Sequence, residues 1–542
     1  MADTNNILSS WNSKKDDTNN IRIKNLEDRV RYLESYAIQD LNTYIKETFL
    51  MQRTGKVFTS KFPLFSVSQS SKGIKIDDNA DMQCNLSTQH QKNKNDYENE
   101  PMFKPIDCNW KLDDTTGKII ITAIDGQGSF SRNGSNGQVG VINMPWYVRT
   151  WKDENYWYIS VTDSPKANYD LLTECFTPQK ENQGFMVHSK YLMGDIGGKP
   201  YSASGLIPLC NDNSLLNTSS IKPSFKTLID YCHKLSSYYC AETNYDLFFI
   251  QLQFLIKFAN LNMTQALNSA IGINLEPFVR INENIVNDKI TIFDSIDMYK
   301  LASKTSISGV TNNFGTYTTA STGDDFWYKT ISSVNYNDNS INVEDIGNIS
   351  VASGDGFIIM PWKTGICDNI LSCDGCYSGG RTNNVPLLIG GIECFSGGRE
   401  VLGNVFSVTQ DDTTRIIRKS LANKLTSDEV DLKTYSDRIA SIPIPIQGGY
   451  ISECTIQVAQ SFISPLKYEA TSSTGFSSTV IYDAAYSQGQ VREVICLYNN
   501  FWELDLSRQL DNGFILPTGY PDRHSYNIVS RLSPNGMCQR SS

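Results

Sequence analysis

The most regular hydrophobic pattern in the chain lies in residues 21–52 and predicts a helix. Its first apolar positions are spaced 3, 4, 3 and 4 residues apart, which is the a/d seam of a coiled coil. These positions are Ile23, Leu26, Val30, Leu33 and Ala37. After Ala37 the apolar row moves to Leu41, Ile45 and Phe49, out of step with a strict heptad. Such a shift is typical of a stutter, which relaxes the supercoil.

Two charged residues flank this seam. Val30 at position a and Leu33 at position d place Arg29 at g and Glu34 at e, where interchain salt bridges select partners. This spacing resembles the signature of short trimeric coiled coils, so residues 21–52 are predicted to hold a homotrimer. The predicted trimerisation residues are Leu26, Arg29, Val30, Leu33, Glu34 and Ala37. The alternative is a single amphipathic helix packed on its own domain, and a helix this short needs support from other domains in either case.

Most of the remaining chain has β-type patterning. Short runs with alternating apolar residues, separated by Gly, Asn and Asp, predict β-rich domains over residues 53–220, 276–425 and 426–542. The strands expected from these runs include 118–123, 139–144, 157–161, 451–458, 479–486 and 491–497. The predicted fold class is therefore α+β and mostly β, with an N-terminal coiled coil followed by β-rich domains and a short helical insert.

The helical insert is expected at residues 221–275 and forms a connecting module. Pro223 and Ser224 can begin one helix, and Asn244 can cap a second one. The second helix carries its apolar residues on one face, at helical spacing.

Composition and charge indicate which partners the chain can have and in which compartment it is made. Lys and Arg number 48 against 58 Asp and Glu, for a net charge of −10. Since duplex binding needs a positive surface that releases counterions, nucleic acid is not an expected partner. Residues 1–20 are polar and predict a flexible arm without an apolar signal core, and no segment is apolar enough for membrane insertion. We therefore expect synthesis in a reducing cytoplasm, where most of the 13 cysteines stay free thiols.

The strongest candidate for metal chemistry is a cysteine cluster. Cys373 and Cys376 have zinc-knuckle spacing, and Cys367 and Cys394 could complete a four-thiolate site. A single Cys-x-x-Cys pair favours free thiols, with zinc or an oxidised loop as alternatives. The chain has four histidines without metal-ligand spacing, no phosphate-binding loop and no nucleophile elbow. No catalytic residue, metal or cofactor is predicted, and the chain is not expected to be an enzyme.

Two passages carry a resemblance to a known class. Residues 251–272 and 385–407 resemble a helix and a Gly-Gly strand-loop-strand passage of phage tail and fibre proteins that have a C-type-lectin-like receptor-binding domain. Residues 354–362 match the place of another core strand of that fold. The resemblance implies a C-type-lectin-like domain over residues 276–425. Ile392 stands where the family usually has Trp, and the chain continues well past residue 425, which suggests an additional C-terminal domain.

The resemblance also implies a function. The chain is expected to be a phage virion protein, made in the host cytoplasm, and a trimeric tail fibre or receptor-binding protein. The arm of residues 1–20 would dock to other virion proteins, and the distal β-rich domains would bind a host cell-surface glycan or protein. The alternatives are a fibre without receptor binding, such as a head fibre or baseplate connector, and a polysaccharide depolymerase.

Candidate receptor contacts lie around the glycine pairs. Residues 390–391 and 397–398 are Gly-Gly pairs, which permit positive φ and could display side chains on rigid loops. The candidate receptor-binding residues are Trp362, Tyr377, Phe395, Arg399 and Glu400. The alternative is that Trp362 belongs to the core and that the others are ordinary loop residues.

Overall fold

A computed structural model describes most of the first half of the chain and separate segments of the second half. The described residues are 41–206, 208–209, 224–262, 266, 279–280, 289–291, 306–311, 328–335, 340–343, 356–359, 364–376, 386–395, 399–411, 413–421, 424–443, 450–469, 491–497, 500–506 and 528–540. The predicted arm of residues 1–20 and the predicted strand 479–486 lie outside this set. The six predicted trimerisation residues lie outside it too: Leu26, Arg29, Val30, Leu33, Glu34 and Ala37.

The described chain is mostly β, as predicted, and its first half contains two antiparallel sheets. The first has the order β2-β1-β7-β6-β8: Ile74–Asp77, Val57–Pro63, Tyr156–Thr162, Tyr147–Lys152 and Asp170–Leu171. The second has the order β4-β3-β5-β9: Ile119–Ile124, Ile106–Leu112, Gln138–Asn143 and Met186–Ser189. A small hairpin pairs β10 (Gly194–Ile196) with β11 (Lys199–Tyr201). Strands β4, β5 and β7 confirm three predicted runs, because their alternating apolar residues face a shared core.

Four further sheets consist only of strands from the second half. One has the order β24-β23-β22-β27-β28: Ser436–Pro443, Thr414–Ser420, Arg399–Asp411, Val491–Leu497 and Asn500–Asp505. Another has the order β13-β18-β15-β16-β17-β14: Val279–Arg280, Gly356–Ile359, Ser306–Thr311, Tyr328–Asn335, Ser340–Val343 and Lys289–Thr291. A third has the order β19-β20-β21: Gly375–Cys376, Pro386–Ile389 and Ile392–Phe395. The fourth is the hairpin of β25 (Tyr450–Gln457) and β26 (Phe462–Glu469).

The expected boundary between residues 425 and 426 divides one of these sheets. Strand β22 pairs with β23 before the boundary and with β27 after it, and β29 (Ile528–Val529) lies parallel to its first residues. A second crossing pairs β12 (Cys240–Ala241) with β30 (Leu532–Ser533). In the described residues, the segment 426–542 therefore shares a sheet with the residues before it, because β22 pairs with the adjacent strand β23 on one edge and with the distant strand β27 on the other.

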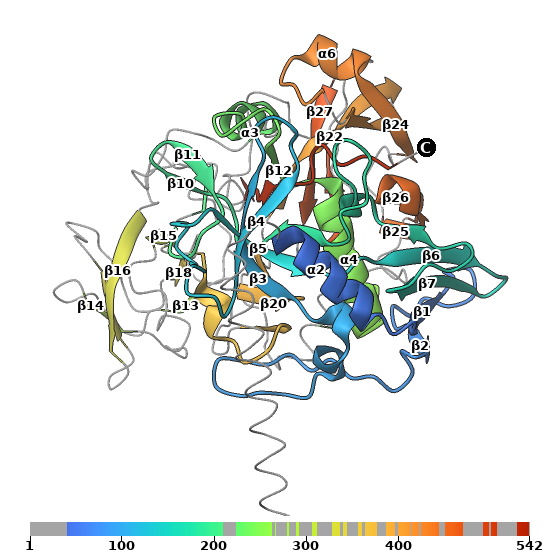
Figure 1. Ribbon diagram of the computed structural model, residues 1–542, viewed down its shortest axis with the longest axis horizontal. Helices are drawn as coiled ribbons and strands as arrows, with labels where there is room; N and C mark the ends of the chain where they lie inside the picture. The colour runs from blue at the N-terminus through green and yellow to red at the C-terminus, as the bar shows by residue number, and fades with distance from the viewer. Residues whose placement is uncertain are drawn as a thin grey trace, which may run out of the picture.

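The helical insert is confirmed at residues 225–258. Helix α3 (Phe225–Cys232) is capped by Ser224, as predicted. Helix α4 (Asn244–Phe258) is capped by Thr243 rather than Asn244, because Thr243 and Asp246 form a reciprocal capping box. Every residue of α4 up to Lys257 is buried, so the predicted single apolar face is wrong. Figure 1 shows the reason: α4 lies in the middle of the molecule with strands around it, among them β1, β7, β20, β22 and β26.

Helix α2 (Leu41–Gln52) packs on its own chain. The apolar row predicted after the stutter, Leu41, Ile45 and Phe49, is the buried face of this helix. The Asn42 side chain fixes the helix to strand β4, donating to the Ile119 carbonyl at 2.5 Å and accepting from the Ile121 amide at 2.9 Å. The expectation that residues 41–52 belong to an interchain seam is therefore wrong, because these apolar side chains are already buried within the chain.

A short helix, α6 (Glu429–Thr434), connects β23 to β24 and begins at the Asp428 cap. In the described part of the chain, no helix is both long enough and apolar enough to cross a membrane.

Candidate functional site

Of the five predicted receptor contacts, Glu400 alone has a side chain that the structure describes. Trp362 and Tyr377 lie outside the described residues, and Phe395 and Arg399 are described only as the end of β21 and the start of β22. Glu400 is buried, with 0% of its surface exposed, and its carboxylate lies 3.2 Å from the Arg531 guanidinium. The expectation that Glu400 is displayed is therefore wrong. A charged side chain on an inward-facing strand position is held by a buried partner, not offered to a ligand.

The Gly-Gly pair at residues 390–391 has the predicted backbone but not the predicted location. Gly390 and Gly391 turn β20 into β21 with φ of 55° and 81°. Both residues are buried, and a Cβ on Gly390 would lie 2.8 Å from the side-chain nitrogen of Gln253 in α4. The turn allows the hairpin to approach the central helix closely. The described parts of the two passages that carry the resemblance, in α4 and in this hairpin, therefore pack against each other in the interior. Residues 397–398 lie outside the described residues.

The cysteine cluster does not form the four-thiolate site. Cys367, Cys376 and Cys394 are buried free thiols, and Cys373 is a half-buried one. Burial raises the pKa of the Cys376 and Cys394 thiols to about 12, so both are protonated thiols in the metal-free protein. In the described ranges, no group of three or more His, Cys, Asp or Glu side chains is arranged to hold a metal ion.

A buried polar network at the start of α4 has the composition of a catalytic triad but not its geometry. His188 Nδ1 lies 2.9 Å from the Asp246 carboxylate, and the Ser533 hydroxyl donates to the same carboxylate at 2.5 Å. In a triad the serine would bond to the histidine. His188 stacks on Phe249, with ring centroids 4.4 Å apart, and Asn535 donates to Asp246 at 2.8 Å. The network is closed to solvent and ties the end of the chain to the central helix.

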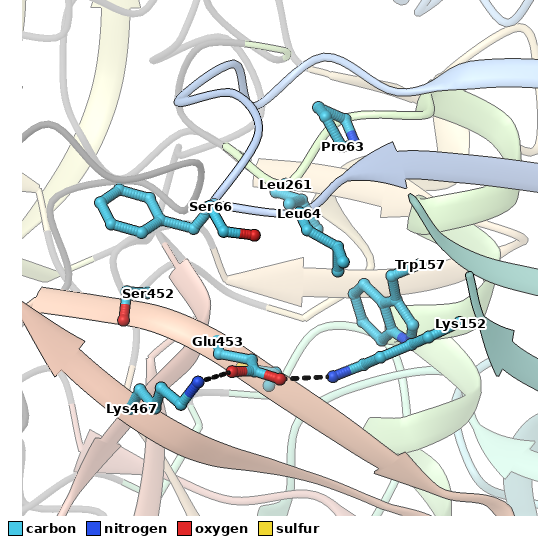
Figure 2. A pocket seen from close by; sticks show the side chains of 11 residues that line it. Pro63, Leu64, Ser66, Lys152, Trp157, Leu261, Ser452, Glu453 and Lys467 are labelled. Atoms are coloured by element: carbon cyan, nitrogen blue, oxygen red, sulfur yellow. Dashed lines mark hydrogen bonds and ion pairs between the residues drawn. The ribbon is translucent and has the colours of Figure 1, made fainter. Parts of the chain in front are cut away.

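An open cleft of about 440 Å³ lies between the first sheet and the β25–β26 hairpin (Figure 2). One wall is apolar and consists of Pro63, Leu64, Phe65, Trp157 and Leu261. Pro63 ends β1, and a backbone turn from Leu64 to Val67 carries the next lining residues. Trp157 comes from β7, packs against Phe62 and is 5% exposed, so little of its ring is open to the cleft.

The opposite side of the cleft is polar. Glu453 in β25 accepts from Lys152 at 2.7 Å and from Lys467 at 2.8 Å, through different carboxylate oxygens. Figure 2 shows the two lysines converging on Glu453 from opposite sides, with Ser452 beside them. The register of β25 against β26 shifts on both sides of Glu453, and such bulges redirect side chains.

The electrostatics of this wall follow from the ion pairs. Burial raises the pKa of the Glu453 carboxyl, but the hydrogen bonds from Lys152 and Lys467 outweigh it and hold the pKa below its ordinary value. Glu453 is therefore ionised across the neutral range. The cleft can take a ligand of small-oligosaccharide size with one apolar face and several polar groups.

Sequence reasoning missed this cleft. Lys152 and Glu453 are 301 residues apart, and they come from strands of different sheets. No local spacing could have connected them. The predicted strand 157–161 includes Trp157, but its pattern indicated only ordinary β-structure.

Comparisons with protein-family models, with curated proteins and with solved structures found no match, so the interpretation of the cleft depends on the chain's own residues.

Proposed function

We propose that this chain is a phage virion protein that attaches the particle to a host cell surface, as a trimeric tail fibre or receptor-binding protein. The observation that carries the proposal is the two-walled cleft. It is open to solvent and has the volume of ordinary ligand sites. It also combines an apolar wall with preformed charged groups. We propose that the cleft binds the receptor and catalyses no reaction on it.

The buried framework supports this assignment. The helix and the Gly-Gly hairpin that carry the resemblance to lectin-like fibre proteins contact each other through Gln253 and Gly390. A C-type-lectin-like arrangement of residues 276–425 remains part of the proposal. In that arrangement the hairpin would be scaffold, and the receptor contact would lie elsewhere, at the cleft.

The proposed trimer uses residues 21–40. Residues 41–52 are occupied by contacts within the chain, so the proposed seam ends before Leu41. The arm of residues 1–20 would bind other virion proteins. Three copies of a weak site on one particle would gain avidity without strong binding at each site.

The proposal is tested by binding of the purified, labelled full chain to cells of the phage's host, with an unrelated bacterium as control. We expect saturable binding to the host alone. A matched pair of variants locates the site. Ser66→Trp places a large ring at the exposed rim of the cleft, whereas Gln69→Trp places it in the same loop at a residue outside the lining. Ser66→Trp should abolish binding and Gln69→Trp should retain it.

A folded trimer that binds neither cell type would contradict the proposal. It would favour a fibre that contacts only other virion proteins. Release of reducing ends from host polysaccharide would instead favour a depolymerase.

A further inference from the structure

The hairpin of β6 and β7 carries a row of aromatic side chains on the face of the first sheet that points away from the cleft. Neighbouring residues of a strand point to opposite faces of a sheet. Lys152 and Trp157 line the cleft. The residues beside them in sequence, Trp151, Tyr156 and Tyr158, therefore point to the other face, and all three are half-buried. Figure 1 shows the hairpin at the edge of the molecule.

The rings of this row hold one another in place. Trp151 stacks on Tyr158, which lies opposite it in the register, with ring centroids 4.7 Å apart and ring planes 7° apart. Tyr156 meets Tyr158 edge to face, with ring centroids 6.2 Å apart. The Tyr158 hydroxyl donates to the exposed Asp153 carboxylate at 2.6 Å. Because these side chains are already positioned, a ligand that binds them loses little of their conformational entropy.

A cation lies at each end of the row. The guanidinium carbon of Arg149 is 4.6 Å from the centre of the Trp151 ring, and the Lys61 ammonium is 4.3 Å from the centre of the Tyr156 ring. Among the described residues, neither cationic group forms a hydrogen bond or an ion pair. A ring attracts a cation through its quadrupole and leaves the N–H donors without oxygen acceptors. Both cations can therefore donate to an anionic ligand.

The separation of the two cations limits the kind of anion. Tyr158 lies opposite Lys61 on one side and opposite Trp151 on the other, and Arg149 is two residues from Trp151 along β6. With strands about 4.8 Å apart and a rise of about 3.4 Å per residue, the Cα atoms of Lys61 and Arg149 are about 12 Å apart. The net charge of −10 also repels a densely charged polymer such as nucleic acid. The row therefore suits a ligand whose negative charges are widely spaced.

The remaining groups of the row favour a polysaccharide over a peptide. An arginine fork pairs with a carboxylate through charge-assisted hydrogen bonds. Sugar hydroxyls can bond to the Asp153 carboxylate and to the Tyr156 hydroxyl. A peptide brings backbone groups that need partners, whereas the backbone groups that β7 shares with β1 and β6 already bond to one another.

We infer that this row, from Arg149 across the three rings to Lys61, binds an acidic polysaccharide with widely spaced carboxylates. Trp151 is a positioning residue for Arg149. The inference goes beyond the proposed function and does not depend on it, because the row and the cleft lie on opposite faces of the sheet. Binding at one row should be weak, since salt screens charges that are partly in water. The row would hold the chain in a polysaccharide layer, whereas the cleft makes the host-specific contact.

The test uses hyaluronan, a soluble polysaccharide with one carboxylate in each disaccharide. It is compared with hyaluronan whose carboxylates have been reduced to primary alcohols, and with single-stranded DNA. Binding of the full chain is measured by biolayer interferometry at low salt. We expect native hyaluronan to bind about tenfold or more tightly than the reduced form, the effect of its charge-assisted hydrogen bonds, and more tightly than DNA.

Four variants complete the test. Arg149→Gln should weaken hyaluronan binding about fivefold or more, the effect of one charge-assisted hydrogen bond. Trp151→Ala should weaken it similarly, and Trp151→Phe, which keeps a ring beside Arg149, should restore most of the binding. Lys433→Gln is the control, because it removes the same charge from an exposed ion pair outside the row and should not change binding. Circular dichroism verifies that each variant is folded.

The outcomes separate this inference from the proposed function. Equal binding of the two forms of hyaluronan, or of the unaltered chain and Arg149→Gln, would overturn the inference. Tighter binding of DNA would also overturn it and would indicate a nucleic-acid surface. Absence of hyaluronan binding by a chain that still binds host cells overturns this inference alone. Absence of host-cell binding by a chain that binds hyaluronan overturns the proposed function alone, and Ser66→Trp at the cleft should leave hyaluronan binding unchanged.

Discussion

The buried ion pair between α4 and the segment before the Gly-Gly hairpin offers a quantitative test of the framework. Lys257 and Asp374 are both 0% exposed, and the Lys257 ammonium lies 2.8 and 2.9 Å from the two carboxylate oxygens. Asp374 also accepts from the Asn95 side chain at 2.9 Å and from the Gly390 amide at 2.8 Å. Replacing Lys257 with Met removes the positive charge and leaves the carboxylate buried beside three neutral donors, the third being the Cys373 thiol at 3.4 Å.

The expected magnitudes follow from this geometry. Lys257→Met should lower the free energy of unfolding by about 3–5 kcal/mol, the usual cost of leaving one charge of a buried pair. Adding Asp374→Asn removes that charge and keeps an oxygen for the Gly390 amide. The double variant should therefore lose only about 1–2 kcal/mol, the cost of one or two weakened hydrogen bonds. The second substitution thus recovers about 2 kcal/mol in the background of the first.

Urea unfolding followed by tryptophan fluorescence and by circular dichroism measures both variants. A pH series adds a second check. Burial raises the pKa of Asp374, but Lys257 outweighs it and holds that pKa below its ordinary value. Without Lys257 the Asp374 carboxyl protonates more readily. The difference in the free energy of unfolding between Lys257→Met and the unaltered chain should therefore become smaller as pH falls from 7 towards 5. A double variant that is no more stable than Lys257→Met would refute the reasoning, because it would show that the buried charge is not the cause of the loss.

Three further predictions test other parts of the account. Burial raises the pKa of the Glu174 carboxyl from 4.5 to about 8. The stabilising contribution of protonated Glu174 should therefore be fully present below pH 4.5 and fall by about 2–4 kcal/mol as pH rises to 8, and Glu174→Gln should remove this part of the pH dependence of urea midpoints. Gly390→Ala combines positive φ with a close contact on α4 and should cost about 1–3 kcal/mol, whereas Gly198→Ala, with φ of 79° and open space, should cost about 1 kcal/mol or less. Equal costs in the same unfolding assay would contradict the proposed close approach. Val30→Asp with Leu33→Asp should convert the proposed trimer to a monomer in light scattering without changing the β-type circular dichroism, and a surviving trimer would place the interface elsewhere.

Much of the secondary structure followed from local pattern. Strands β4, β5, β7, β25 and β27 lie where the sequence pattern predicted them. In β4 the buried side chains alternate, as the period of two requires, whereas β5 is buried on both faces. The Ser224 cap was likewise readable, since a cap depends on neighbouring residues alone.

The features that the sequence did not predict depend on contacts between residues far apart in the chain. The central position of α4 and the burial of Glu400 by Arg531 could not be read from spacing, because the partners lie on separate segments. The boundary at residue 425 failed for the same reason: β22 needs strands from both sides of it. The cleft has no local signature either, since Lys152 and Glu453 meet only after the chain has folded.

Competition for phage adsorption tests the central claim most directly. The purified full chain is added to host cells before the phage, and free phage is counted over time. The account predicts that the unaltered chain and Gln69→Trp slow adsorption in a saturable manner, while Ser66→Trp at the cleft does not. Equal inhibition by Ser66→Trp would contradict the role of the cleft. Absence of inhibition by the folded, unaltered chain would contradict the claim that this protein attaches the particle to its host.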